Sequence, residues 1–254
     1  MLNNIPQVTK NLFLLNVVFF LATLILETKG IDLRTILGTH YMNSPDFQPY
    51  QVVTHFFIHQ NWIHIILNMW LFLMLGGHLE RLWGPKRFFI FYVLCALGAF
   101  ALHNCIGVYQ IYELKQQLLT DFPMESIDNI IRNHSDQQTV DALNEYIRVK
   151  NLPINQNLQS YYDLSRSTMF GASGAVFGVL AAFAILFPNQ EFLLYFAIPI
   201  KAKFLVGAYF IFEIYQAYQN NPTDQVAHLA HIGGAIVGAL IVLYWRKRDR
   251  TNFY

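Results

Sequence analysis

The sequence predicts an all-α polytopic membrane protein with six membrane-spanning helices. Hydrophobic residues make up 54% of the 254 residues and charged residues only 13%, whereas a soluble domain usually carries about 25% charged residues. Six runs are long and apolar enough, or nearly so, for a bilayer core of ~30 Å, which needs ~20 residues per helix. The expected spans cover approximately residues 11–27, 62–82, 87–107, 171–188, 199–218 and 226–245.

The first expected span follows a short segment, residues 1–10, that carries one basic residue. No small-residue cleavage site stands out after the apolar run, so we interpret it as a retained membrane helix rather than a removed targeting segment. The next segment, 28–61, contains Pro45, Pro49 and several aromatic residues. It is too irregular to span the bilayer and is expected to rest at the membrane interface.

A polar insertion separates the third and fourth spans. Residues 108–168 are rich in Asp, Gln and Asn, and residues 135–151 predict an amphipathic helix with Val140, Leu143 and Ile147 on its apolar side. We interpret the insertion as a solvated lobe outside the membrane, and a role in admitting substrate is the alternative. The expected organisation is therefore 1–107 with three spans, 108–168 as the insertion, and 169–254 with three spans and a basic tail.

Basic residues predict the orientation. Ten of the seventeen Lys and Arg residues fall on one side if six helices alternate: Lys10, Arg81, Lys86, Arg87, Lys201, Lys203, Arg246, Lys247, Arg248 and Arg250. The positive-inside rule places that side and both termini in the cytoplasm, with the insertion outside. The short N-terminal segment favours a prokaryotic plasma membrane.

Charge and cysteine content exclude other classes of function. The net charge of +1 gives no argument for a nucleic-acid partner. Cys95 and Cys105 are ten residues apart in one apolar run, and at about 3.6 residues per turn they face different ways on a helix. We interpret both as buried packing residues and predict neither a disulfide nor a metal site.

Polar side chains gather near the outer ends of three spans. They are His55, His59, His64 and Asn68 around the start of the second span, Ser173 in the fourth, and His228 and His231 in the sixth. Polar groups in hydrocarbon are costly and usually face the interior of the bundle or a water-filled cavity. Because these three spans run in the same direction, the clusters lie at a common depth and are expected to converge.

These residue types fit nucleophilic catalysis. The Ser173 hydroxyl needs a base to take its proton, and the imidazole of His231 is the candidate. The Ser173 backbone N–H, His64 and Asn68 are candidate donors to an oxyanion, and the last two share a helix face at a spacing of four. We find no Asp or Glu in the fourth or sixth span, so the sequence predicts a Ser–His dyad rather than a triad.

Small residues accompany the candidate pair. Gly174 and Gly178 on the fourth span, and Gly234 and Gly238 on the sixth, form faces that let membrane helices approach closely. The run from Ser173 to Pro188 has sixteen residues, about 24 Å of helix, which is shorter than the bilayer core. Ser173 is therefore expected in a recess that opens to the exterior.

Four stretches together resemble the rhomboid family of intramembrane serine proteases: GASG at 171–174, AHIGGAIVG at 230–238, HFFIHQNWIHIILN at 55–68 and GGHLERLWGPKRF at 76–88. The resemblance covers roughly 11–107 and 169–246, and it implies a rhomboid-like bundle of six helices. It implies Ser173 as nucleophile, His231 as base, and His64 with Asn68 as oxyanion donors. Supporting roles are expected for Gly171, Gly174, Gly234, His55, His59 and His228, with hydrogen bonds from the three histidines.

The resemblance also implies the partners. Rhomboids cleave single-pass transmembrane proteins within or beside the spanning helix, without metal or cofactor, so the expected partners are such substrates and the lipid bilayer. The chain departs from the family in its first loop, since residues 28–50 contain no tryptophan where family members commonly carry a Trp-Arg pair. Glu80 matches a recurring family position whose role the sequence does not reveal.

Two other classes of function are the alternatives. An inactive rhomboid relative that binds and routes membrane clients typically lacks the serine or the histidine, and this chain has both. A channel or transporter would need a polar path through the membrane. The polar residues lie in the outer half of the spans only, which favours a dead-end recess that opens to the exterior and does not continue through the membrane.

Overall fold

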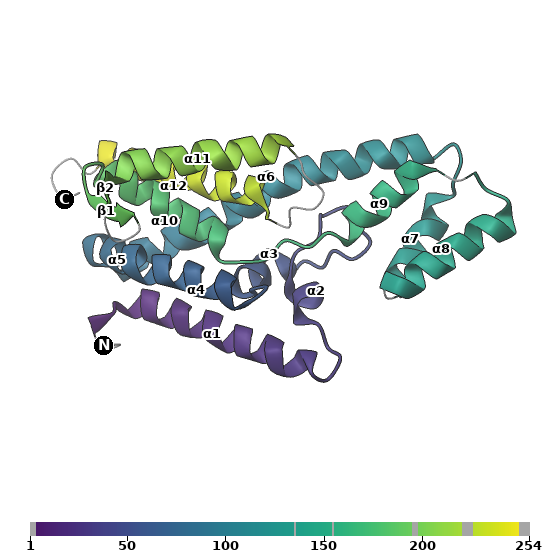
Figure 1. The fold of residues 1–254 in the computed structure, drawn as a ribbon, viewed down its shortest axis with the longest axis horizontal. Coiled ribbons are helices and arrows are strands. Elements are labelled where there is room, and N and C mark those ends of the chain that lie inside the picture. Colours follow the sequence, from purple (N-terminus) through teal and green to yellow (C-terminus); the bar gives the residue numbers. More distant parts are fainter. Residues whose placement is uncertain (1–3, 135, 154, 195–197, 220–225, 249–254) are drawn as a thin grey trace.

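The computed structural model describes residues 4–134, 136–153, 155–194, 198–219 and 226–248. These residues form a bundle of long helices with a helical lobe at one end (Figure 1). The elements are α1 (Gln7–Glu27), α2 (Leu33–Leu37), α3 (Gln51–Thr54), the 3₁₀ turn η2 (His55–Phe57), α4 (Trp62–Leu71), the π-helical turn η3 (Phe72–Gly76), α5 (Gly77–Trp83), α6 (Pro85–Leu118), α7 (Met124–Asn133), α8 (Asp136–Lys150), α9 (Gln156–Arg166), α10 (Ser173–Leu186), β1 (Glu191–Leu194), β2 (Ile198–Lys201), α11 (Ala202–Gln219) and α12 (His228–Arg248).

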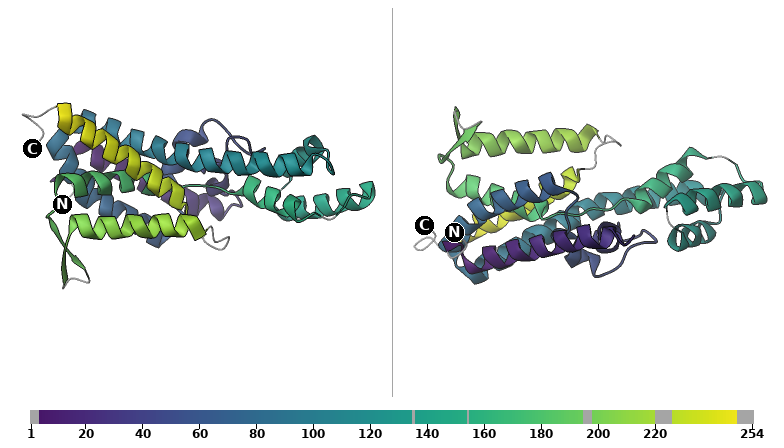
Figure 2. Two further views of the ribbon diagram at one scale, coloured as in Figure 1. Left: turned by 90° about the horizontal axis from the view of Figure 1, so that it is seen from above. Right: turned by 60° about the horizontal axis from the view of Figure 1, so that its bottom comes forward.

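The bundle confirms a multi-pass membrane protein. Among the described residues, four helices are long and apolar enough to cross a bilayer: α1, the continuous helix Trp62–Trp83 made by α4, η3 and α5, then α6 and α12. Helix α10 is apolar but has 14 residues, and α11 has 18. Helix α10 lies inside the bundle, and α11 runs along its edge against α12 and α10 (Figure 2), so six spans remain compatible with the structure.

Helix α10 lies at the centre of the bundle. Nearly all its residues are buried, as expected of a helix that is apolar on every side, and it packs against α6, α11, α12 and η3. Its contact with α12 is between backbones, because a Cβ on Gly234 would lie 1.9 Å from the carbonyl oxygen of Gly174. Small residues therefore set the distance between the two helices that carry Ser173 and His231.

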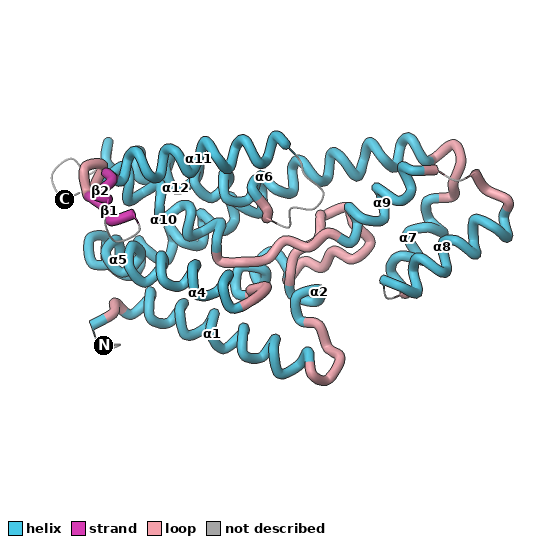
Figure 3. The backbone as a smooth tube through the Cα atoms, in the orientation of Figure 1, coloured by secondary structure: helices cyan, strands magenta, loops and turns pink. Residues whose placement is uncertain are grey.

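The lobe is built on an extension of α6. This helix continues through residue 107, where the sequence analysis placed a boundary, and ends at Leu118. The reason is packing, since Ile111 and Leu118 are fully buried in an apolar cluster with residues of α7, α8 and α9. Figure 3 shows α6 extending into the lobe beside α9. The expected helix at 135–151 is present as α8, with Leu143 buried; residue 135 lies outside the described residues.

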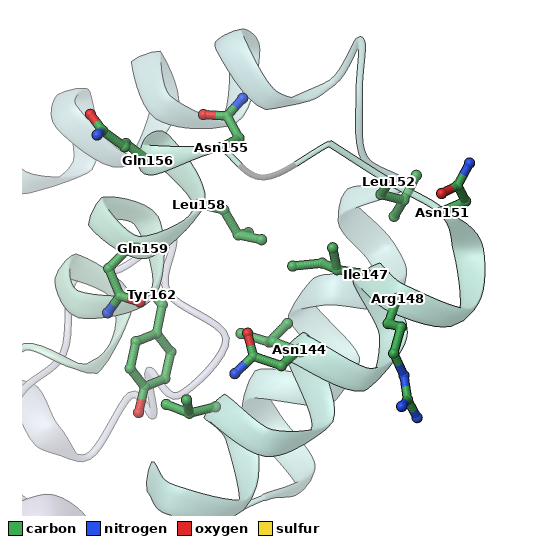
Figure 4. Close-up of a pocket in the computed structure, with 12 residues that line it drawn as sticks. Asn144, Ile147, Arg148, Asn151, Leu152, Asn155, Gln156, Leu158, Gln159 and Tyr162 are labelled. Atoms are coloured by element: carbon green, nitrogen blue, oxygen red, sulfur yellow. The ribbon is translucent and has the colours of Figure 1, made fainter.

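The lobe also contains a pocket of its own. It has a volume of about 580 Å³ and lies between α8 and α9. Figure 4 shows Asn144 and Ile147 of α8 opposite Leu158 and Tyr162 of α9. The lobe lies at the far end of the molecule from β1 and β2 (Figure 1).

Two sequence expectations need correction. A two-stranded antiparallel hairpin pairs Glu191 with Lys201 and Leu194 with Ile198. The fifth helix therefore begins at Ala202 rather than at 199, because the preceding residues are held in β2. Cys95 is buried as expected, but Cys105 is exposed. Its position on α6 faces away from the buried side, and both cysteines are free.

Glu80 of α5 is hydrogen-bonded to the start of α1. Its carboxylate accepts hydrogen bonds from the backbone N–H of Val8 at 2.9 Å and of Thr9 at 2.7 Å, and from the Thr9 hydroxyl at 2.7 Å. The first N–H groups of a helix have no partner within the helix, and Pro6, the residue before α1, provides no side-chain cap. Glu80 supplies these acceptors from another element.

Candidate active site

The first loop holds the segment that leads into α10. Thr39 and Met169 form an isolated β-bridge, with backbone N–H···O distances of 2.8 and 2.9 Å. The N–H of Gly171 donates to the carbonyl oxygen of His55 at 2.9 Å. Gly171 has φ of 127°, a conformation that strongly favours glycine. This turn brings the chain into α10 with Ser173 as its first residue.

Ser173 and His231 are in contact. The distance from Ser173 Oγ to His231 Nε2 is 2.9 Å. Ser173 is half-buried and His231 is 7% exposed. The two side chains come from the first turns of α10 and α12, and the close glycine contact between these helices lets a short serine side chain reach the imidazole.

Two further groups hold the His231 ring. Phe177, one turn after Ser173, stacks on it with ring centroids 4.0 Å apart and an interplanar angle of 7°. On the other side, His231 Nδ1 lies 2.9 Å from Oε2 of Glu213, a residue of α11 that is 2% exposed. The ring is therefore fixed by a stacking contact and by polar partners at both nitrogens.

Glu213 also contacts His228. Nδ1 of His228 lies 2.6 Å from the same Oε2 atom. Glu213, His228 and His231 have the residue types of a metal site, but ligands at about 2.0–2.2 Å from a tetrahedral zinc ion stand roughly 3.3 Å apart. The observed separations of 2.6 and 2.9 Å are hydrogen-bond distances. The arrangement is thus a carboxylate that accepts from two imidazoles.

His64 lies near Ser173, with Gly171 close to both side chains. A Cβ built on Gly171 would be 3.0 Å from both Cε1 and Nε2 of His64 and 3.4 Å from Ser173 Oγ. The imidazole and the hydroxyl therefore flank the same glycine, and the absence of a side chain at Gly171 leaves the space between them open. His64 is half-buried near the start of α4, whose N-cap is the Asn61 side chain.

Asn68 lies one turn further along α4. Its Nδ2 donates to the carbonyl oxygen of His64 at 3.0 Å, and no hydrogen bond joins it to Ser173 or His231 in the described part of the chain. An amide has a second N–H, which leaves one donor on the same helix face as His64. The backbone N–H groups of the first turn of α10, which starts at Ser173 without a side-chain cap, add further donors.

His55 and His59 lie near the site but do not contact Ser173 or His231 through a hydrogen bond in the described structure. His55 Nδ1 lies 2.8 Å from the carbonyl oxygen of Gln51, so it stabilises the loop whose backbone holds Gly171. The hydrogen bond expected from His59 is absent among the described residues, because both ring nitrogens are buried without a partner. Its ring instead packs edge-on against His64, with centroids 5.0 Å apart. Burial lowers the pKa of His55 to about 4 and, with the charge of His64, that of His59 to about 3.

Sequence reasoning missed Glu213. The fourth and sixth spans carry no acidic residue that could orient His231, and the carboxylate lies on the fifth. A signal was present, since Glu213 is the one acidic residue of α11 and an acidic residue in an apolar span usually marks a functional position. Pairing it with His231 required the rotation of α11 against α12, which the sequence pattern does not give.

A cleft opens beside the site. Its volume is about 1030 Å³, and it is lined by residues from α6, α9, the loop before α10 and the outer ends of α11 and α12. The lining includes Phe170, three residues before Ser173, and His228, one turn before His231. The lobe contributes polar side chains such as Gln117, Ser160 and Asp163. The cleft therefore joins the surroundings of the Ser173–His231 pair to the lobe.

Comparison with known proteins identifies the family of the chain. A family model of the rhomboid domain matches residues 46–111 and 153–248, together more than half of the chain. The unmatched residues between them are the end of α6 with α7 and α8. An uncharacterized mitochondrial rhomboid protein of the fission yeast Schizosaccharomyces pombe is 37% identical over 87 residues, which is 32% of this chain and 22% of that protein. The expected prokaryotic membrane gains no support from this relative.

Proposed function

The chain belongs to the rhomboid family, which supports intramembrane protease activity in general, and on this premise we propose that it is a serine endopeptidase acting on single-pass transmembrane proteins. The observation that carries the proposal is the 2.9 Å contact between Ser173 Oγ and His231 Nε2. A serine hydroxyl within hydrogen-bonding distance of an imidazole is the arrangement needed to activate the nucleophile.

The proposed reaction is acyl transfer to Ser173 followed by hydrolysis. Ser173 Oγ attacks the carbonyl carbon of the scissile peptide bond while His231 Nε2 takes the hydroxyl proton. The C–N bond then breaks, and the proton passes from His231 to the leaving amine. A water molecule that gives its proton to His231 hydrolyses the acyl-enzyme and restores Ser173. No metal or cofactor takes part in this scheme.

The oxyanion of the tetrahedral intermediate needs preorganised donors. We assign this role to the Ser173 backbone N–H and His64, with Asn68 as a third donor through its second N–H. The position of His64 beside Gly171 and Ser173 supports the assignment, and the positive end of the α10 dipole adds to it. Loss of one such donor typically raises the barrier by about 2.7–4 kcal/mol.

The proposed substrates are transmembrane helices that unwind near the outer face of the bilayer. A helix buries its carbonyl groups in hydrogen bonds, so a scissile carbonyl is accessible only where the helix opens. The half-buried position of Ser173 at the start of α10 and the neighbouring cleft support entry of the substrate to Ser173 from the lobe side.

We also propose that the lobe faces the exterior and both termini the cytoplasm. The start of α1 and the end of α12 lie at the same end of the bundle, opposite the lobe (Figure 1), and α12 ends in Arg246, Lys247 and Arg248. A prokaryotic plasma membrane remains the expected location. Labelling of Gln159→Cys, an exposed position of the lobe, by an impermeant maleimide in intact cells tests the orientation, with Cys105→Ser added because Cys105 is free and exposed; no labelling before permeabilisation would refute it.

Cleavage of a model transmembrane substrate in liposomes tests the function. We expect Ser173→Ala and His231→Ala to lose cleavage by at least about 10³-fold, because each removes a member of the reacting pair. Ser126→Ala and His134→Ala, matched substitutions in the lobe, should cleave at the wild-type rate. Unchanged cleavage by either site variant would reject the mechanism, and an inactive wild type would favour the inactive relative that binds membrane clients.

A further inference from the structure

Glu213 is a buried carboxylate in an apolar helix. It is 2% exposed and is the one acidic residue of α11. Burying a carboxylate away from water is strongly unfavourable unless hydrogen-bonding partners compensate for the lost hydration. In the described structure those partners are the two imidazoles of α12. The two histidines therefore supply the hydrogen bonds that this buried carboxylate requires.

The hydrogen bonds define which nitrogen of His231 carries the proton. An ionised carboxylate only accepts hydrogen bonds, so the Nδ1–H groups of His228 and His231 donate to Glu213 Oε2. A neutral imidazole has one N–H, and a proton on Nδ1 leaves Nε2 bare. The bare Nε2 of His231 is the atom 2.9 Å from Ser173 Oγ. This is the tautomer that can accept the serine proton.

The carboxylate also fixes the rotation of the ring. Phe177 holds the plane of the His231 imidazole by stacking, but stacking alone allows the ring to flip by a half-turn about its Cβ–Cγ bond, which exchanges the positions of its nitrogens and carbons. Contacts at Nδ1 with Glu213 and at Nε2 with Ser173 remove that freedom. His228 donates to the same oxygen and keeps the carboxylate in place.

We infer that Glu213 is the positioning residue of the Ser173–His231 pair, which makes the site a Ser–His–Glu arrangement assembled from α10, α12 and α11. The inference rests on the proposed protease function. Glu213 selects the Nδ1–H tautomer of His231, orients its ring and stabilises the imidazolium that forms when His231 takes the serine proton. The dyad expected from the sequence is thereby extended by a third residue on another helix.

The test separates this role from that of a structural clamp between α11 and α12. Glu213→Gln keeps the volume and the capacity for hydrogen bonds but removes the charge. We expect kcat for a transmembrane substrate in liposomes to fall by about 10²–10⁴-fold, with KM within about twofold of wild type and an unchanged thermal midpoint. Glu80→Gln, the same substitution at a buried carboxylate remote from Ser173, should lower the thermal midpoint and leave kcat unchanged.

A second measurement needs no substitution at Glu213. Nitrogen-15 NMR of histidine-labelled wild-type enzyme in liposomes reports the tautomer of His231, assigned from the spectrum of His231→Gln. The inference predicts a protonated Nδ1 and a bare Nε2 at neutral pH.

Two results would overturn the inference while the protease function stands: an active wild type with inactive Ser173→Ala but full kcat in Glu213→Gln, or a His231 with its proton on Nε2. Loss of kcat in Glu213→Gln only in proportion to lost folded protein would identify a structural clamp. Absence of cleavage by the wild type would instead reject the proposed function.

Discussion

At the scale of single residues, the proposed function and the stability of the fold depend on buried polar groups. Glu80 and Glu213 are the buried glutamates of the described chain, at 3% and 2% exposure. Glu213 accepts from two histidines of the site, whereas Glu80 accepts from two backbone N–H groups and a hydroxyl at the start of α1. Each compensates for its burial with hydrogen bonds, but only Glu213 contacts a member of the proposed catalytic pair, His231.

Removing the Glu80 side chain should destabilise the protein. Glu80→Ala leaves the N–H groups of Val8 and Thr9 without acceptors in a buried place, which costs about 2–4 kcal/mol of unfolding free energy. Denaturation with increasing mole fractions of sodium dodecyl sulfate measures the loss. Cleavage per folded molecule should stay at the wild-type level; a fall in kcat without a change in stability would show that Glu80 serves the site instead.

The residues of the candidate site differ in how far the sequence could reveal them. Ser173, His231 and His64 stand out because polar groups are rare in apolar spans and because the spans carrying them share a direction. Glu213 stands out as well, but its partner depends on helix rotation. The ring contact of His59 and the donation of Asn68 to the His64 carbonyl depend on side-chain conformation, which periodicity does not determine.

At the scale of elements, the pair α10 and α12 sets the site geometry. A methyl group on Gly234 would lie 1.9 Å from the carbonyl oxygen of Gly174, so the helices must separate to accommodate it. We expect Gly234→Ala to lower both the stability and kcat, the latter by about tenfold or more, because a misplacement of ~1 Å costs up to about 10²-fold in rate.

Gly207 provides the matched control for this prediction. It lies in α11, and a Cβ there would meet nothing within 4 Å. Gly207→Ala should leave activity unchanged and stabilise the helix slightly, since alanine is the better helix former by about 1 kcal/mol. Equal behaviour of the two variants in thermal unfolding and in cleavage would contradict the assigned role of the glycine contact.

The lobe is the element expected to influence substrate choice. Ser160 of α9 is exposed and lines the cleft that reaches the surroundings of the site. Ser160→Trp should fill part of this cleft and raise KM roughly tenfold, about 1.4 kcal/mol, for substrates with a long extramembrane flank. The kcat of a short-flanked substrate should not change. Asn129→Trp, on an exposed position of α7 outside the cleft, serves as the control.

An unchanged KM for every substrate would leave the lobe as a solvated appendage, the interpretation that the sequence analysis placed first. The family match omits residues 112–152, so the α7–α8 part of the lobe lies outside the shared domain. The sequence predicted the polar insertion and helix α8, but not the continuation of α6 to Leu118. That continuation depends on apolar contacts of Ile111 and Leu118 with helices distant in the chain.

At the scale of the whole molecule, the composition of the sequence was sufficient to predict the architecture. A low charge content and long apolar runs predicted an all-α membrane bundle, and the described helices confirm it. The hairpin of β1 and β2 was not foreseen, because four-residue strands beside a span give too short a pattern to detect. Helix α10 has 14 residues and is short for a bilayer; the recess expected around Ser173 stays a prediction.

The molecule as a whole places Ser173 at the start of a central buried helix, 2.9 Å from His231 of α12, and we propose that this serine is reactive. Labelling with a fluorophosphonate followed by peptide mapping tests this claim most directly. The account predicts one adduct, on Ser173, in the wild-type protein in liposomes, and none in His231→Ala. Labelling of His231→Ala at the wild-type rate, or an adduct on another serine only, would contradict it.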